Sequence, residues 1–193
     1  MGEIRSSLEI AMEKAERLGR ASKEEVTAAK WREAGRKAAA DFLFKPDVDL
    51  KGAVSGFDRE ALPKVLEGVQ DVLLRNVNLP RNPDAWPTIR RALAGLVELK
   101  GSPAAQVVAQ VEQLLKAYEQ TLDQYRRQMR SQLEGRLGSV RQAVAQQYGA
   151  AAAANVDVEA LPEFQQEWSR ISGEIAAQFE AQLAPLKHYL SQL

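Results

Sequence analysis

The chain has 193 residues, of which 45% are hydrophobic and 27% charged. Its 26 basic and 26 acidic residues cancel, which argues against a general electrostatic attraction to nucleic acid, anionic membranes or acidic substrates. Cysteine is absent. Disulfides, thiolate nucleophiles and sulfur-bound metals are therefore excluded, and a cytoplasmic location is expected. No stretch reaches the roughly 18 consecutive apolar residues of a membrane span. The abundance of alanine, leucine, glutamate, glutamine, lysine and arginine predicts an all-α fold.

The first third of the chain carries signals for two helices. Ser6-Ser7-Leu8-Glu9 fits a capping box, and a helix is expected to follow it. The apolar residues of this helix share one face and are Leu8, Met12, Ala15 and Leu18. Gly19 is expected to end it. A second capping box at residues 22–25 predicts a separate helix that ends before Pro46.

The string D-x-E-A-L-P occurs twice, at residues 58–63 and 157–162. Proline is favoured at the first position of a helix, where its missing amide hydrogen costs nothing, so both copies predict helix beginnings. Residues 45–57 are expected to form a loop, and the proline-rich segment 78–87 a second one. The helix after it is expected to close at Gly101.

Two long apolar seams occupy the C-terminal half. No proline interrupts residues 104–148, and apolar residues recur there at spacings of four and three: Val111, Leu115, Tyr118, Leu122, Tyr125 and Met129. The second seam follows Pro162 and comprises Phe164, Trp168, Ile171, Ile175, Phe179 and Leu183. Two seams joined by a short connection predict an antiparallel, coiled-coil-like hairpin. Pro185 is expected to end or kink the returning helix.

The predicted organisation is an N-terminal helical region over residues 1–101 and a long helical hairpin over residues 102–193. A chain of this length has no need of a second domain, so the two regions are expected to form one structural unit, a helical bundle.

A run of arginines in the first arm of the hairpin is the most basic feature. Its members are Arg126, Arg127, Arg130, Arg136 and Arg141. Such a run fits phosphates along a nucleic-acid backbone. The favoured alternative is pairing with the acidic returning helix. With Tyr148 opposite Pro162, Arg130 would lie near Glu180. Stacking aromatics, which single-strand binders use, are missing from the run.

Residues 47–58 parallel a calcium-binding EF-hand loop. The acidic positions are Asp47, Asp49 and Asp58. Lys51 replaces a ligand, Asp58 is too short to act as the bidentate glutamate, and Pro46 breaks the entering helix. The favoured alternative is a turn in which Gly52 and Gly56 allow positive backbone angles and Asp58 caps the next helix.

Catalytic constellations are missing. His188 is the single histidine, so no histidine pair can hold zinc. No nucleophile elbow, P-loop or dinucleotide fingerprint occurs. The sequence therefore predicts a protein that is not an enzyme and has no cofactor, metal or small-molecule substrate.

The opening residues Met1-Gly2-Glu3-Ile4-Arg5-Ser6-Ser7-Leu8-Glu9-Ile10-Ala11-Met12-Glu13-Lys14 resemble the N-terminus of a family of uncharacterised bacterial helical proteins. The resemblance covers the first helix. It implies a bacterial origin and assigns a role to no residue.

No activity follows from these features. The leading hypothesis is an interaction or scaffolding protein that acts through self-association or by docking a partner helix, since its apolar seams exceed its recognisable chemistry. The alternatives are a nucleic-acid-binding module that uses the Arg126 to Arg141 arm and an amphipathic binder of lipid surfaces. Zero net charge disfavours both.

Overall fold

The computed structural model describes the backbone of residues 7–148 and 157–193, and the side chains of residues 23–135, 138, 142, 146–147 and 157–193. Over these ranges the chain forms helices and no β-strand, which confirms the predicted all-α fold. The chain divides into two compact units. Unit 1 reaches to Asn78 and includes Asp84–Ala104, and unit 2 consists of Leu79–Pro83 and the chain from Ala105 onward.

Unit 1 begins with one long helix rather than two. Helix α1 runs over Ser7–Phe44, a length of 38 residues, so the prediction that Gly19 ends a first helix is wrong. A glycine inside a helix costs only about 1 kcal/mol relative to alanine, and the alanine, glutamate and lysine residues around it favour helix. The second capping box is an internal S-x-x-E string. The end of α1 is as predicted, two residues before Pro46.

The segment after α1 contains a short helix that the sequence did not predict. Helix α2 covers Leu50–Ser55, and the Asp49 carboxylate caps it by accepting a hydrogen bond from the Gly52 amide at 2.7 Å. Gly56 has a φ of −76°. Among the described residues, a positive φ occurs at Gly101 alone. The expectation of a turn with positive angles at Gly52 and Gly56 is therefore wrong, because a helix takes its place.

Two longer helices of unit 1 begin and end close to the predicted positions, and a short helix lies within the proline-rich segment 78–87 that was expected to form a loop. Helix α3 covers Leu62–Arg75, the short helix η1 covers Pro83–Ala85, and α4 covers Trp86–Lys100. The Asp58 carboxylate accepts a hydrogen bond from the Ala61 amide, which confirms its predicted capping role. Gly101, at a φ of 71°, ends α4 as predicted.

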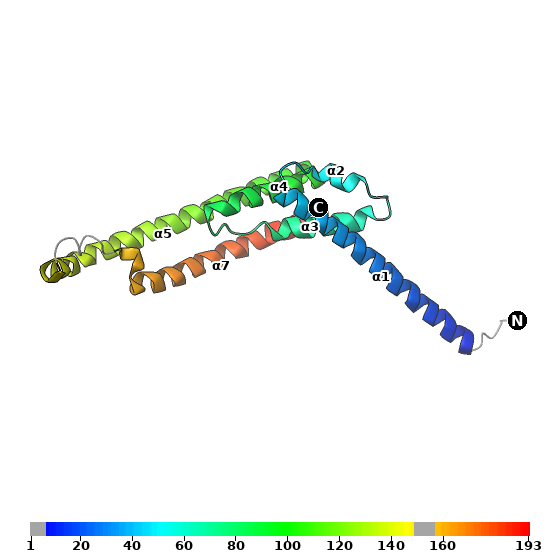
Figure 1. Ribbon diagram of the computed structural model, residues 1–193, viewed down its shortest axis with the longest axis horizontal. Coiled ribbons are helices and arrows are strands. Elements are labelled where there is room, and N and C mark those ends of the chain that lie inside the picture. Colours follow the sequence, from blue (N-terminus) through cyan, green and yellow to red (C-terminus); the bar gives the residue numbers. More distant parts are fainter. Residues whose placement is uncertain (1–6, 149–156) are drawn as a thin grey trace. The chain divides into compact units, whose positions relative to one another are not determined.

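Helices α1 and α3 run in the same general direction and cross at close range (Figure 1). Two ion pairs join residues 35 positions apart, Arg32 with Glu67 at 2.9 Å and Arg36 with Asp71 at 3.4 Å. The residues buried around this contact and under α2 and α4 are Ala39, Phe42, Leu43, Leu50, Val65, Val69, Leu73, Ile89, Leu93 and Leu96. Figure 1 shows α1 crossing α3 with its second half, while its first half, in dark blue, extends beyond α3.

Unit 2 is built on two long helices. Helix α5 covers Ser102–Tyr148, which confirms the predicted uninterrupted helix. After the short helix η2 over Val158–Ala160, helix α7 covers Pro162–Gln192. Pro185 lies inside α7 and does not end it. Buried Leu183 and Leu190 lie on either side of this proline, so packing holds the helix across it.

Helices α5 and α7 are antiparallel, as Figure 1 shows. The rings of Tyr118 and Phe179 meet edge to face at 5.4 Å. Further along α5, Met129 shares a buried cluster with Val158 and Phe164. The residue numbers on α7 thus fall as those on α5 rise. One predicted seam residue is misplaced, because Tyr125 is 46% exposed.

Candidate functional site

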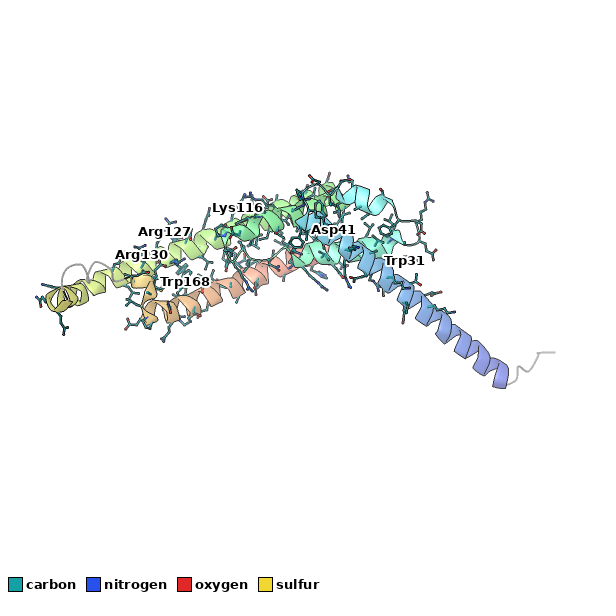
Figure 2. The ribbon with its side chains drawn as sticks, viewed as in Figure 1. Trp31, Asp41, Lys116, Arg127, Arg130 and Trp168 are labelled. Carbon is teal, nitrogen blue, oxygen red and sulfur yellow. The ribbon has the colours of Figure 1, made fainter. Side chains whose placement is uncertain are left out.

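The described part of the arginine run is paired with carboxylates. Arg126 contacts Glu159 through an ion pair, and its guanidinium lies 5.8 Å from the centre of the Trp168 ring. Arg130 donates to Glu134 at 3.0 Å. Figure 2 shows Arg127 and Arg130 on α5 and Trp168 on α7. Of Arg136 and Arg141 the backbone alone is described, within α5.

The electrostatics around Arg130 and Arg127 follow from these partners. The hydrogen bond to Glu134 raises the pKa of the Arg130 guanidinium, and the charges of Glu159 and Asp157 add to the effect. Arg127 lies 3.9 Å from Asp123, with both side chains largely exposed. A pair of this kind contributes little. Arg127 is therefore the most accessible cation among the three described arginines.

The predicted pairing of the two arms has the wrong register. Arg130 lies beside Glu134, Glu159 and Asp157 rather than Glu180. Glu180 instead acts on Tyr118, whose pKa is raised first by burial and then by this neighbouring negative charge. The prediction placed the start of α7 opposite the end of α5. In the structure η2 lies against Met129 before α7 begins, which shifts every facing pair.

Charge pairing along α7 is mainly local. Arg170 donates to Glu167 at 2.5 Å and to Glu174 at 2.7 Å, both on its own helix. Between the arms, the ion pair of Arg126 with Glu159 and the cluster around Phe164 make the contact at this end. At this end of the hairpin, packing and the ion pair of Arg126 with Glu159 therefore hold the two arms together.

The EF-hand-like segment is used for capping. Asp49 caps α2 and Asp58 caps the entry to α3, while Asp47 is exposed in the turn before α2. No group of three or more histidine, aspartate or glutamate side chains placed to hold a metal occurs within the described ranges. The same ranges contain no helix long and apolar enough to cross a membrane.

Arg91 has a structural role that the sequence did not predict. Its guanidinium donates to the carbonyl oxygens of Phe42 and, at 2.6 Å, of Lys45, and it lies 4.7 Å from the centre of the Phe42 ring. The carbonyls at a helix C-terminus lack partners within the helix and carry partial negative charge. Arg91 therefore closes the end of α1. Only the fold brings α4 to that end, so no local signal could have revealed this contact.

A groove of about 460 Å³ lies where α1 meets α3. It is lined by Glu33, Ala34, Arg36, Lys37, Ala40 and Val72. The Arg36 guanidinium bonds to Glu33 and Asp71, both at 3.4 Å, and its buried Nε has no hydrogen-bond partner among the described groups. The terminal nitrogens of Arg36 are thus engaged with carboxylates.

The remaining candidate is the first part of α1, residues 7–30. The described side chains of this part, from Lys23 onward, are exposed except Ala28, which is partly buried. Val26 is 53% exposed. In contrast, Gly35 and Ala39 are buried. Val26 and Gly35 are nine residues apart, which is about two and a half helical turns. Val26 therefore lies on the side of α1 opposite Gly35, in a stretch whose described side chains are exposed almost all round the helix.

The lengths of the helices explain why the described side chains of this part of α1, from Lys23 onward, are exposed within unit 1. At 1.5 Å per residue, α1 is about 57 Å long and α3 about 21 Å. Given the parallel pairing of Arg32 with Glu67, α3 reaches back only to about residue 27 of α1. The sequence indicated an apolar face from Leu8 to Leu18, whose side chains lie outside the described ones. Reading Gly19 as a helix end hid its continuation to Val26 and Ala29.

Comparison with known proteins gives one match. The model of a family of unknown function (DUF6657) matches residues 51–192. No curated protein matches the chain, and neither does any solved structure. The matched region begins in α2 and leaves α1 outside it. The resemblance of residues 1–14 to a bacterial family thus stays a prediction. Since the match spans well over half of the sequence, the chain belongs to this family of unknown function.

Proposed function

We propose that the protein is a non-enzymatic interaction protein, located in the cytoplasm, that binds a helix of another protein molecule along the first part of α1. The observation that carries the proposal is the exposure of Val26 and its neighbours on a helix that continues far beyond α3.

The described side chains of the first part of α1 bury little surface. Most helical stability in proteins comes from packing one face of the helix. Residues 7–30 carry apolar side chains at helical spacing, yet the described ones are exposed. A partner helix on this face would supply the missing burial.

The charges of α1 favour a protein partner over a lipid surface. Residues 7–30 contain five acidic and five basic residues. Interfacial membrane helices are instead rich in lysine and arginine on their polar face. The pairing of Arg126 and Arg130 with carboxylates likewise leaves the basic arm a poor match for nucleic-acid phosphates.

The test uses the full chain and a matched pair of variants. Val26→Glu puts a charge on the exposed apolar face, and Thr27→Glu puts the same charge one residue away, about 100° round the helix. Light scattering measures self-association, and affinity capture followed by mass spectrometry detects other partners. We expect association that Val26→Glu abolishes and Thr27→Glu preserves, with both variants folded by circular dichroism. A wild-type monomer that captures no protein would overturn the proposal.

A further inference from the structure

We infer that the partner of α1 is a second copy of this chain, and that the first parts of two α1 helices pair antiparallel through one heptad stripe with complementary flanking charges. The inference rests on the proposed function and gives its partner and geometry. It combines the continuity of α1 from Ser7, the exposure of its described outer face and the order of its residues.

The stripe follows a strict heptad. With α1 continuous through Gly19, residues spaced alternately by four and three fall on one face: Leu8, Met12, Ala15, Gly19, Ser22, Val26 and Ala29. Four of these seven are alanine, glycine or serine, and small residues at such a seam let two helices approach closely. Serine is compatible with the seam because, in a helix, its hydroxyl can bond to the carbonyl one turn earlier. The described members, Val26 and Ala29, are exposed.

The order of sizes along the stripe fits an antiparallel pair. In that arrangement Met12 faces Ala29 of the second copy, Ala15 faces Val26, and Gly19 faces Ser22. The outer layers therefore each join a larger residue to a smaller one, which fills the space between the helices evenly. The central layers join two small residues, so the backbones can come closest there. A parallel pair would put Met12 against Met12 and Gly19 against Gly19, leaving one layer crowded and another empty.

The charges beside the stripe give the same orientation independently. The positions that flank one edge are Glu9, Glu16, Lys23 and Lys30, seven residues apart. In an antiparallel pair each of these positions faces the equivalent heptad position on the second copy. Glu9 then faces Lys30, and Glu16 faces Lys23. The two-fold symmetry of the pair repeats both contacts, which gives four attractive pairs.

A parallel pair would form fewer attractive contacts between these flanking charges. There each flanking position meets a residue five positions earlier on the other helix, which pairs Glu16 with Ala11 and Lys23 with Leu18. Only Lys30 would meet an opposite charge, that of Glu25. Flanking charges set the orientation and partner choice of paired helices, so the sequence of α1 is complementary to itself in one direction.

The face used for this pairing is separate from the one that builds unit 1. The close contact of Gly35 with α3, at Gly68 and Val65, lies on the side of α1 opposite Val26. Lys23 and Lys30 are exposed. A second α1 can therefore lie along the outer face without displacing α3.

Charge reversal and mixing test the pairing. The variant Glu9→Lys/Glu16→Lys makes all four flanking positions basic, and Lys23→Glu/Lys30→Glu makes them all acidic. We expect wild-type chains to dimerise and each variant alone to associate at least about tenfold more weakly, because like charges then face each other. An equimolar mixture should restore dimers at wild-type strength. The control Glu13→Lys/Glu24→Lys adds the same charge away from the stripe and should dimerise normally.

Introduced cysteines test the orientation. The natural chain has none, so oxidation reports only the introduced pair. Ala15→Cys and Val26→Cys chains should cross-link to each other when mixed and form no disulfide alone, since these positions face each other only in the antiparallel dimer. Cross-linking of each variant with itself would overturn the orientation.

The outcomes separate this inference from the broader proposal. A wild-type monomer in sedimentation equilibrium would overturn the inference. If that monomer still bound another protein in a way that Val26→Glu abolished, the proposed function would stand without it. Dimers that survive both charge reversals unchanged would also overturn the pairing.

Discussion

Gly35 of α1 and Gly68 of α3 lie at a crossing where the two backbones touch. A Cβ atom on Gly35 would come within 2.0 Å of the Val65 carbonyl oxygen, and one on Gly68 within 2.0 Å of the Arg32 carbonyl oxygen. The obstacle is backbone in both cases. No side-chain rotation can therefore make room for even a methyl group.

Gly35→Ala and Gly68→Ala should each strongly destabilise unit 1. Overpacking a well-packed contact typically costs about 1–3 kcal/mol, and we expect the upper end or beyond because helices must separate. The measurement is urea unfolding followed by circular dichroism.

Gly173→Ala is the matched control for both glycine substitutions. Gly173 lies in α7 with no atom within 4 Å of the position of its Cβ. Alanine should stabilise the helix there by roughly 0.5–1 kcal/mol. Equal effects at Gly35 and Gly173 would contradict the close crossing.

Arg91→Ala should destabilise the end of α1. The substitution removes hydrogen bonds to the Phe42 and Lys45 carbonyls, and charged hydrogen bonds are worth about 1.5–3 kcal/mol. The neighbouring Arg90 only lies over the Trp86 ring, at 5.2 Å, so Arg90→Ala should cost less than about 1 kcal/mol. Thermal unfolding compares the two variants, and a larger loss for Arg90 would refute this role.

Substitution by alanine should lower the free energy of unfolding at Arg126 but not at the adjacent Arg127. Arg126 pairs with Glu159 and lies over Trp168, so Arg126→Ala should cost about 1 kcal/mol through the lost cation–π and packing contacts. Arg127→Ala should cost nearly nothing. Tryptophan fluorescence during unfolding is suited to this comparison, because Trp168 lies beside Arg126. Similar losses for both would show that the hairpin contact is misassigned.

Stability in acid should depend on Glu67. Its hydrogen bonds from Lys64 and then Arg32 lower the pKa of this carboxyl below its ordinary value. A lowered folded-state pKa gives stability that is present above the unfolded-state pKa, about 4.3 for glutamate. That stability is lost as the pH falls through the lowered value.

The Glu67→Gln variant should therefore lose part of the acid sensitivity. Because Glu67 is half exposed, the effect at neutral pH should stay below about 1 kcal/mol. The measurement is the urea midpoint of both proteins between pH 7 and pH 3. Parallel curves over that range would rule out this linkage.

The sequence predicted most helix boundaries because local chemistry sets them. Pro46 and Gly101 mark the ends of α1 and α4, and the two D-x-E-A-L-P strings mark the beginnings of α3 and α7. Local signals gave a wrong helix end where the helix accommodates a residue that often ends helices. Gly19 lies inside α1, where the neighbouring residues favour helix, and Pro185 lies inside α7 without ending it.

Relations between elements were the least predictable part. The register of α5 against α7 depends on where η2 and the start of α7 lie along α5, and no spacing within either seam records that. The closeness of Gly35 to Gly68 likewise needs both helices in place. For the candidate site, the heptad of α1 was present in the sequence from Leu8, but its extent depended on knowing that α1 is continuous.

Two sides of helix α1 have different roles. The side that carries Gly35 and Ala39 is buried and packs within unit 1. The side that carries Val26 and Ala29 is exposed, and the packing of α3 does not depend on it. The outer side can therefore accumulate or accept substitutions without loss of the fold. A new binding specificity could be engineered there by rewriting a few exposed positions, with unit 1 as an unchanged carrier.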